Sequence, residues 1–447
     1  TNIQNFPGDV QIRGTTFIKA NSNSENVAIG TNAGVTVQGE NATALGSGAG
    51  SNAQGDSSVA VGRAAGQFSQ AANAVAVGFN AGRVSQGTKA VAMGYLAGNN
   101  AQGASATAVG YYAGYNQQGT NSVAIGIQAG SASQAANSVA VGVSAGKTSQ
   151  GGSSVAIGHN AGLNAQGATS VAVGYAAGCN SQETNAVAVG TQAGTASQGA
   201  SAVAVGESAG NANQNNYATA VGYRAGCAAQ GVNAVAMGYT AGLNAQGTAA
   251  TAVGDSAGRL SQNTFATALG SGAGYNAQGS NATAVGRLAG DSAQAAGATA
   301  MGLFAGRTAQ GDSATAVGRS AGYNQQGANS VAIGKQAGSA NQNNNATAMG
   351  INAGYNAQGG SATAIGNAAG QVAQGANGVA VGVNAGFNKQ GVSAVTIGVN
   401  SGVNAQGANS VAVGDGSGSA SQGAQCVAVG YLAGRSDQGD SSVAIGN

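Results

Sequence analysis

The sequence predicts an all-β fold, a parallel β-solenoid built of 16-residue turns, about 27 in number. Glycine recurs at every sixteenth position from Gly30 to Gly446, without an insertion or deletion. The residues between these glycines repeat one pattern with substitutions, as in SSVAVGRAAGQFSQAA (57–72) and NAVAVGFNAGRVSQGT (73–88). A short, strict period of this kind is typical of solenoids, in which each repeat forms one turn of a stack. Positions within a repeat are numbered from that glycine, which is position 0.

The first predicted strand of each turn covers positions −4 to −1. In one copy these are Ser58, Val59, Ala60 and Val61, which alternate small and β-branched side chains before Gly62. That alternation is typical of a strand, and the rest of the repeat has room for a second strand and two tight turns. A helix is disfavoured, because each glycine in a helix interior would cost about 1 kcal/mol.

The columns of the repeat predict which positions are buried. Glycine at 0 and +4 never varies in a complete repeat, which indicates backbone that excludes a side chain. Charged residues occur at outward positions such as +1, +5 and +10. We expect the larger strand face, Val/Thr at −3 and aliphatic at −1, to supply the core, leaving an outer alanine stripe for a partner. In the alternative, the faces are reversed and the alanines form a thin core.

Position +8 is glutamine in every complete repeat, from Gln38 to Gln438. A surface position would vary more, so we expect these amides to stack into a structural ladder along the solenoid. The first members of this ladder are Gln38, Gln54, Gln70, Gln86, Gln102 and Gln118.

The two ends differ from the repeats between them. Residues 1–26 lack the period, and DVQIRGTTFIKA (9–20) has the composition of strands. We expect 1–26 to be a cap or docking segment, because the first turn of a solenoid exposes an unpaired edge. Residues 27–447 form the uninterrupted solenoid, which stops inside a repeat and leaves an uncapped edge. Either the chain is truncated there, or that edge docks on the next molecule in a head-to-tail filament.

Composition excludes several classes of protein. Charged residues make up only 6% of the chain and the net charge is +2 without a basic run, so nucleic acid is not an expected partner. Gly, Gln and Asn interrupt every apolar stretch, so no membrane span is expected. Three cysteines (Cys179, Cys227 and Cys426) are too few for a disulfide scaffold. We expect free thiols, with an interchain bond as the alternative.

The strings NSVAIG (121–126), SSVAIG (153–158) and NSVAIG (329–334) resemble the head repeat of YadA-like trimeric autotransporter adhesins. The resemblance implies a left-handed parallel β-roll, a side-by-side trimer and an extracellular location. It extends over residues 27–447, but its specific core is only a six-residue string in each turn. The period here is longer than in that family, and no neck, stalk or anchor is visible. Fibres of phages and large viruses also carry similar repeats, so both a cell surface and a virion surface are open.

Residues for catalysis are sparse. His159 is the single histidine and lies at the outward position +1, while acidic residues such as Glu207 and Asp255 are scattered over many turns. A nucleophile–base pair or a metal site needs such groups clustered, so we expect no enzyme activity, no metal and no cofactor.

Aromatic residues are the exposed feature with most functional interest. Candidate surface contacts are Tyr95, Tyr111, Tyr175, Tyr223 and Tyr239 at +1, with Tyr115 at +5. They could stack on a glycan or protein ligand, or pack on neighbouring turns or at a subunit junction. We expect a non-enzymatic extracellular fibre, acting as a rigid adhesive rod or a filament subunit. The competing class is a glycan-binding or ice-binding module, although ice binding would favour a T-x-T array that is absent here.

Overall fold

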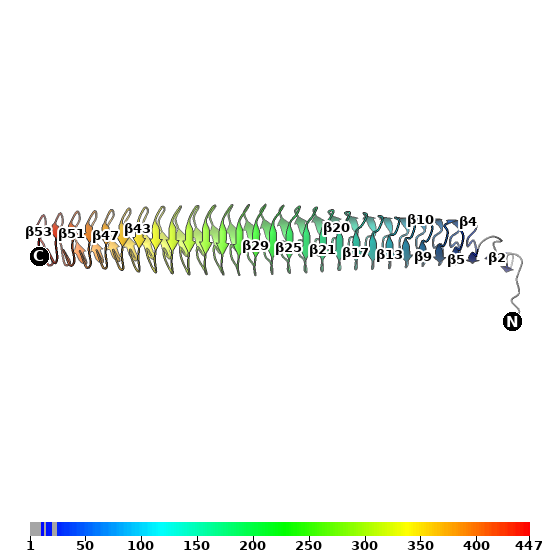
Figure 1. Ribbon diagram of the computed structural model, residues 1–447, viewed down its shortest axis with the longest axis horizontal. Coiled ribbons are helices and arrows are strands. Elements are labelled where there is room, and N and C mark those ends of the chain that lie inside the picture. Colours follow the sequence, from blue (N-terminus) through cyan, green and yellow to red (C-terminus); the bar gives the residue numbers. More distant parts are fainter. Residues whose placement is uncertain (1–9, 13–14, 20–24) are drawn as a thin grey trace, which may run out of the picture. The chain divides into compact units, whose positions relative to one another are not determined.

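The structure is a computed structural model that describes residues 10–12, 15–19 and 25–447. The chain divides into two compact units, Thr1–Val221 and Gly222–Asn447. In both units the described residues form a parallel β-solenoid with about 16 residues per turn, and together they contain about 26 turns (Figure 1). Only strands and turns occur among these residues, which confirms the predicted fold class at this level.

Each turn up to residue 413 contains two strands, each three residues long, and in the last two turns isolated bridges at Ala420 and Ser436 replace the second strand. Odd-numbered strands cover positions −3 to −1 and recur once in every repeat from β3 (Val27–Ile29) to β51 (Val411–Val413), followed by β52 (Val427–Val429) and β53 (Val443–Ile445). Even-numbered strands cover +6 to +8 and recur with the same period from β4 (Thr36–Gln38) to β50 (Asn404–Gln406). Both kinds pair in parallel with the equivalent strand of the next turn, as in Val91↔Thr107 and Gln86↔Gln102. Every column of the repeat therefore becomes a row of stacked side chains.

Two further strands precede the repeats. β1 (Val10–Ile12) pairs antiparallel with β2 (Thr15–Lys19), and β2 pairs antiparallel with β3 through Ile18↔Ile29 and Lys19↔Ala28. The pairing covers one edge of the first turn, as a cap would. The rest of the expected cap, residues 1–9, 13–14 and 20–24, lies outside the described residues, and its role stays a prediction.

The core consists of alanine, glycine and glutamine. Ala106, Ala108 and Ala113, at −4, −2 and +3 of one turn, are all fully buried. Met93 and Ile125, at −1, are instead 44% and 40% exposed. The expectation that the larger face lies inside is therefore wrong, and the reversed arrangement is correct.

The physical reason is the narrow cross-section that so short a turn encloses. A methyl group added to Gly98 would lie 3.1 Å from the Cβ of Ala92 and 2.8 Å from the Cδ of Gln102. The interior beside Gly98 is thus already filled by alanine methyl groups and the glutamine amide. Alanine therefore fits at −2 without displacing its neighbours, and a larger residue occurs there in one turn only, where Thr396 is fully buried. The larger side chains of the other turns point outward.

Closing so small a turn needs several residues with positive φ. In one turn these are Gly94 (φ 131°) and Gly98 (φ 52°), together with Leu96, Ala101 and Ser105 at 54–56°. A Cβ on Gly94 would lie 2.4 Å from the carbonyl oxygen of Gly110 in the next turn. The invariant glycine at position 0 is therefore required both by the backbone conformation and by the close approach between turns.

Candidate functional surfaces

The glutamine ladder lies inside the solenoid. Gln54, Gln70, Gln86, Gln102 and Gln118 are buried, and Gln38 is half-buried. The Nε2 atom of Gln86 donates to the carbonyl of Val75 (2.8 Å) and to Oε1 of Gln102 (3.1 Å). Equivalent amide–amide bonds join Gln38 to Gln54 (3.2 Å), Gln70 to Gln86 (3.0 Å) and Gln102 to Gln118 (3.0 Å). These amides bind the turns to each other and are not available to a ligand.

The ladder is interrupted at several glutamines. Gln70 Oε1 has no donor, and neither do Oε1 of Gln134 and Gln342. Each of these three glutamines precedes a residue other than glycine at +9, namely Ala71, Ala135 and Asn343. That replacement alone does not explain the interruption, because Oε1 still accepts in the four other glutamines that precede such a residue, Gln182, Gln214, Gln262 and Gln294. Oε1 of Gln374, Gln390 and Gln406 also lacks a donor, in the turns around Thr396, the one residue that replaces alanine at −2.

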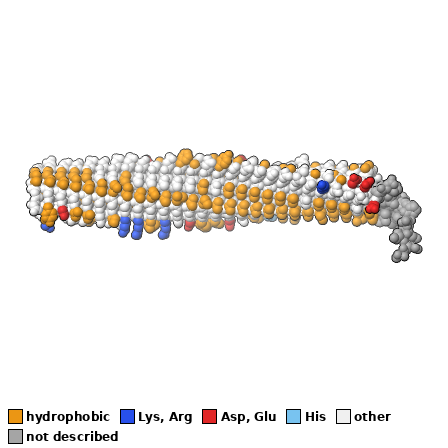
Figure 2. Space-filling view, in the orientation of Figure 1, with side chains coloured by type: hydrophobic (Ala, Val, Ile, Leu, Met, Phe, Trp, Pro, Cys, Tyr) orange, Lys and Arg blue, Asp and Glu red, His pale blue; other side chains and the backbone are white. Residues whose placement is uncertain are grey.

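The reversed strand faces expose what we call the aliphatic stripe, defined as positions −3 and −1 of the odd-numbered strands. Position −1 is aliphatic or methionine, and position −3 is valine in most turns and threonine in the others, as in Thr251 and Thr267. In the first unit Ile125 and Ile157 are 40% and 41% exposed, and in the second Met349 and Ile397 are 40% and 42% exposed. No residue of the stripe is charged in any repeat. Figure 2 shows rows of hydrophobic side chains running along the visible face. A largely apolar, uncharged surface of this kind within each unit indicates a site of protein association.

The aromatic residues of the first unit form an aromatic ladder, Phe79, Tyr95, Tyr111, Tyr112 and Tyr115. Phe79, Tyr95 and Tyr111 stack with centroids 5.2 Å apart and planes 10° apart, close to the spacing of neighbouring strands. Tyr112 lies tilted against Tyr111 and Tyr115, and desolvation raises the pKa of its hydroxyl. The stacked rings of Phe79, Tyr95 and Tyr111 therefore cover one another's faces.

The other candidate tyrosines also pack between turns. Tyr175 stacks on His159 (5.3 Å), and Tyr223 stacks on Tyr239 (5.0 Å). The six candidates are partly accessible, with Tyr115 half-buried and the +1 tyrosines 39–58% exposed. The structure therefore shows the packing on neighbouring turns that was one of the two interpretations. The sequence pattern did not single out Phe79 and Tyr112, although Phe79 lies at +1, the same position as five of the candidate tyrosines.

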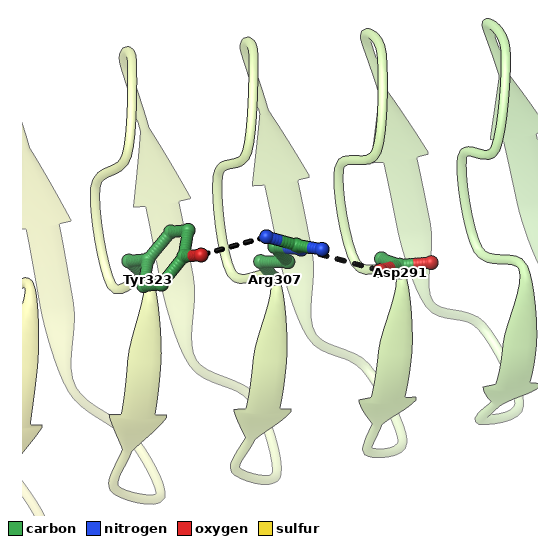
Figure 3. Close-up of polar contacts among 3 residues, drawn as sticks. All are labelled: Asp291, Arg307 and Tyr323. Atoms are coloured by element: carbon green, nitrogen blue, oxygen red, sulfur yellow. Dashed lines mark hydrogen bonds and ion pairs between the residues drawn. The ribbon is translucent and has the colours of Figure 1, made fainter.

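A polar ladder occupies position +5 of the second unit. Arg307 pairs through Nε with Asp291 Oδ2 at 3.3 Å, and its Nη1 donates to the hydroxyl of Tyr323 at 2.7 Å (Figure 3). Its guanidinium also lies 5.2 Å from the ring centroid of Phe304. This is the one ion pair among the described residues. The charges are satisfied by residues one turn away, so the cluster holds the turns together and offers no free acid or base.

A groove of about 580 Å³ lies on the first turns of the first unit. Its floor is formed where three outward positions of one turn carry small residues, Ser47, Gly48 and Ser51. Arg63 and Arg83 lie at its side, and the remaining lining residues include Phe79 and the amides Asn32, Asn52, Gln67 and Asn80. The sequence pattern alone did not indicate this polar concave site.

Other kinds of site are not formed by the described residues. No three His, Cys, Asp or Glu side chains gather there in a group that could hold a metal ion. Cys179 and Cys426 are buried free thiols, and Cys227 is a half-buried one. No helix in this part of the chain is long and apolar enough to cross a membrane. A scan against models of known protein families finds no match, and a search of curated proteins finds no related sequence.

Proposed function

We propose that this protein is a non-enzymatic structural fibre, in which identical chains pack side by side through the aliphatic stripe. The observation that carries the proposal is the exposure of large aliphatic side chains, such as Ile125 and Met349, while alanine fills the core. Leaving such side chains in water is unfavourable, and burying them against a partner recovers about 25 cal/mol per Å².

A second copy of the chain is the partner that fits this surface best. The stripe presents uncharged side chains at the spacing of stacked strands, and an identical chain has the same spacing and composition. Each −1 side chain exposes on the order of 50 Å², so a dozen turns offer on the order of 600 Å². A standard interface buries about 800 Å² on each partner, so the −1 and −3 rows together reach the necessary area.

The resemblance to YadA-like heads supports a left-handed roll, a trimer and an extracellular place at a cell or virion surface. In such an assembly the aliphatic stripe of each chain would face the other two. The buried glutamine and alanine rows would stiffen the rod, which could act as a spacer or adhesive surface. Such rods could also join head to tail into filaments. Electron microscopy distinguishes single rods from filaments.

Sedimentation equilibrium tests the assembly through two matched pairs of substitutions. Ile125→Lys with Ile157→Lys places charge in the stripe, whereas Ile127→Lys with Val143→Lys places the same charge at +1, where these side chains are 51% and 39% exposed. We expect the natural chain to sediment as a trimer, the stripe variant as a monomer and the +1 variant as a trimer. A natural chain that is monomeric at micromolar concentration would contradict the proposal, as would equal dissociation of both variants.

A second candidate function is ligand binding, which the groove of the first unit favours. Glycan is the expected ligand class, because amides and arginines line the groove. Ice binding has no comparable support, since position −1 is aliphatic in every repeat.

A further inference from the structure

We infer that the groove of the first unit binds an acidic saccharide, with Arg63 and Arg83 recognising its carboxylate or sulfate group. The inference rests on the ligand-binding candidate above and is independent of self-association through the aliphatic stripe. Its volume of about 580 Å³ falls within the range of small-ligand sites, roughly 300–1,000 Å³.

The two arginines are oriented before any ligand arrives. The guanidinium of Arg63 lies 5.4 Å from the ring centroid of Phe79, and that of Arg83 lies 5.6 Å from the centroid of Phe68. Arg83 also donates through Nε to Oε1 of Gln67 at 2.9 Å. Stacking holds each guanidinium plane in place and leaves N–H groups for a planar anion, which arginine can bind with two parallel hydrogen bonds.

The positive charge of the groove is not neutralised within the described residues. Neither arginine forms an ion pair there, in contrast to Arg307 of the second unit. The nearest acidic residues along the chain, Glu40 and Asp56, lie at position +10, in the turn after the even-numbered strand, and neither lines the groove. Asp56 already accepts a hydrogen bond from the backbone N–H of Glu40 at 3.0 Å. The positive charge of Arg63 and Arg83 is therefore open to an anionic ligand.

The neutral groups of the groove favour an acidic saccharide over other anionic ligands. Asn32, Asn52, Gln67 and Asn80 bring amides that both donate and accept, which suits sugar hydroxyl groups. A single-stranded nucleic acid would need free aromatic faces on which its bases stack. The face of Phe79 toward the groove is covered by Arg63 and its other face by Tyr95, so that platform is absent.

Isothermal titration calorimetry on the full chain tests the inference. The probes are a short oligogalacturonate, a sulfated galactose oligomer and the uncharged galactose oligomer of equal length; the first two separate carboxylate from sulfate. We expect an acidic oligomer to bind, the uncharged one not to bind, and affinity to fall with added salt. Arg63→Gln and Arg83→Gln should each weaken binding about tenfold or more, as expected for a charge-assisted hydrogen bond.

Two further variants separate a shaped site from general attraction. Ser47→Tyr fills the groove without changing charge, and tyrosine already occupies +1 in other turns, so we expect it to abolish binding. Lys147→Gln removes a cation at +5 of a later turn and should leave affinity unchanged. Natural affinity in both arginine variants would overturn the inference, as would equal binding of the uncharged oligomer or equal losses in Lys147→Gln. Tighter binding of single-stranded DNA would also overturn it. Unchanged sedimentation of the arginine variants keeps this result separate from the proposed assembly.

Discussion

Replacing Gln262 with methionine removes one amide from the buried ladder of the second unit while keeping most of the side-chain volume. The Nε2 atom of Gln262 donates to the carbonyls of Thr251 (2.8 Å) and Ala266 (3.2 Å) and to Oε1 of Gln278 (3.0 Å). Its Oε1 accepts from Nε2 of Gln246 at 3.1 Å. Methionine forms none of these bonds, and it leaves Oε1 of Gln278 buried without that donor.

Gln374→Met is the matched control, because Gln374 already lies in an interruption of the ladder. Its Nε2 donates to the carbonyls of Thr363 (2.8 Å) and Gly378 (3.2 Å), while its Oε1 has no partner. Both substitutions therefore lose two bonds to backbone carbonyls, and only Gln262→Met also loses two amide–amide bonds. At roughly 0.5–1.5 kcal/mol for each bond, the free energy of unfolding should fall about 2 kcal/mol further for Gln262→Met.

Hydrogen exchange followed by mass spectrometry measures this difference, because a destabilised repeat opens locally. For each variant, the exchange rate of the backbone amides near the substitution is divided by the rate in the natural chain. We expect this ratio to be about thirtyfold larger for Gln262→Met than for Gln374→Met, since about 1.4 kcal/mol corresponds to a factor of ten. Equal acceleration in the two variants would refute the reasoning: the glutamines would then act only on backbone carbonyls, and the amide ladder would add nothing to stability.

Four further substitutions test the backbone and the core through chemical denaturation. Gly62→Ala, at φ 125°, would bring a Cβ to 2.5 Å from the carbonyl oxygen of Gly78. It should lower the free energy of unfolding by at least about 3 kcal/mol, and a denaturation curve like that of the natural chain would contradict this. Ala252→Val should overpack the core and lower the free energy of unfolding by about 1–3 kcal/mol, whereas Thr251→Val on the outer face should change it by less than about 0.5 kcal/mol. A larger loss in Thr251→Val than in Ala252→Val would indicate that the face with the larger side chains forms the core. Ala277→Gly, at an exposed position with φ 53°, should raise stability by about 1 kcal/mol, and a loss would show that this conformation carries no strain.

The sequence by itself determined the architecture of the turns. An unbroken period requires equal turns, and equal turns stack residue on residue, as Val91 does on Thr107. The alternation before each glycine located the odd-numbered strands, and the constant glutamine at +8 pointed to a structural ladder. These features depend on local pattern and spacing, which a single chain shows directly.

Only the tertiary structure decided which face of the strand is inside. Alternation shows that Ala108 and Val109 point to opposite sides, but it does not say which side is enclosed. That depends on the width of the closed turn, which the positive-φ residues make narrow enough for alanine to fill in every turn except the one that buries Thr396. The same closure places Ser47 beside Arg63 and so forms the groove. Period and composition are local properties, whereas enclosed volume arises only when the whole turn closes on itself.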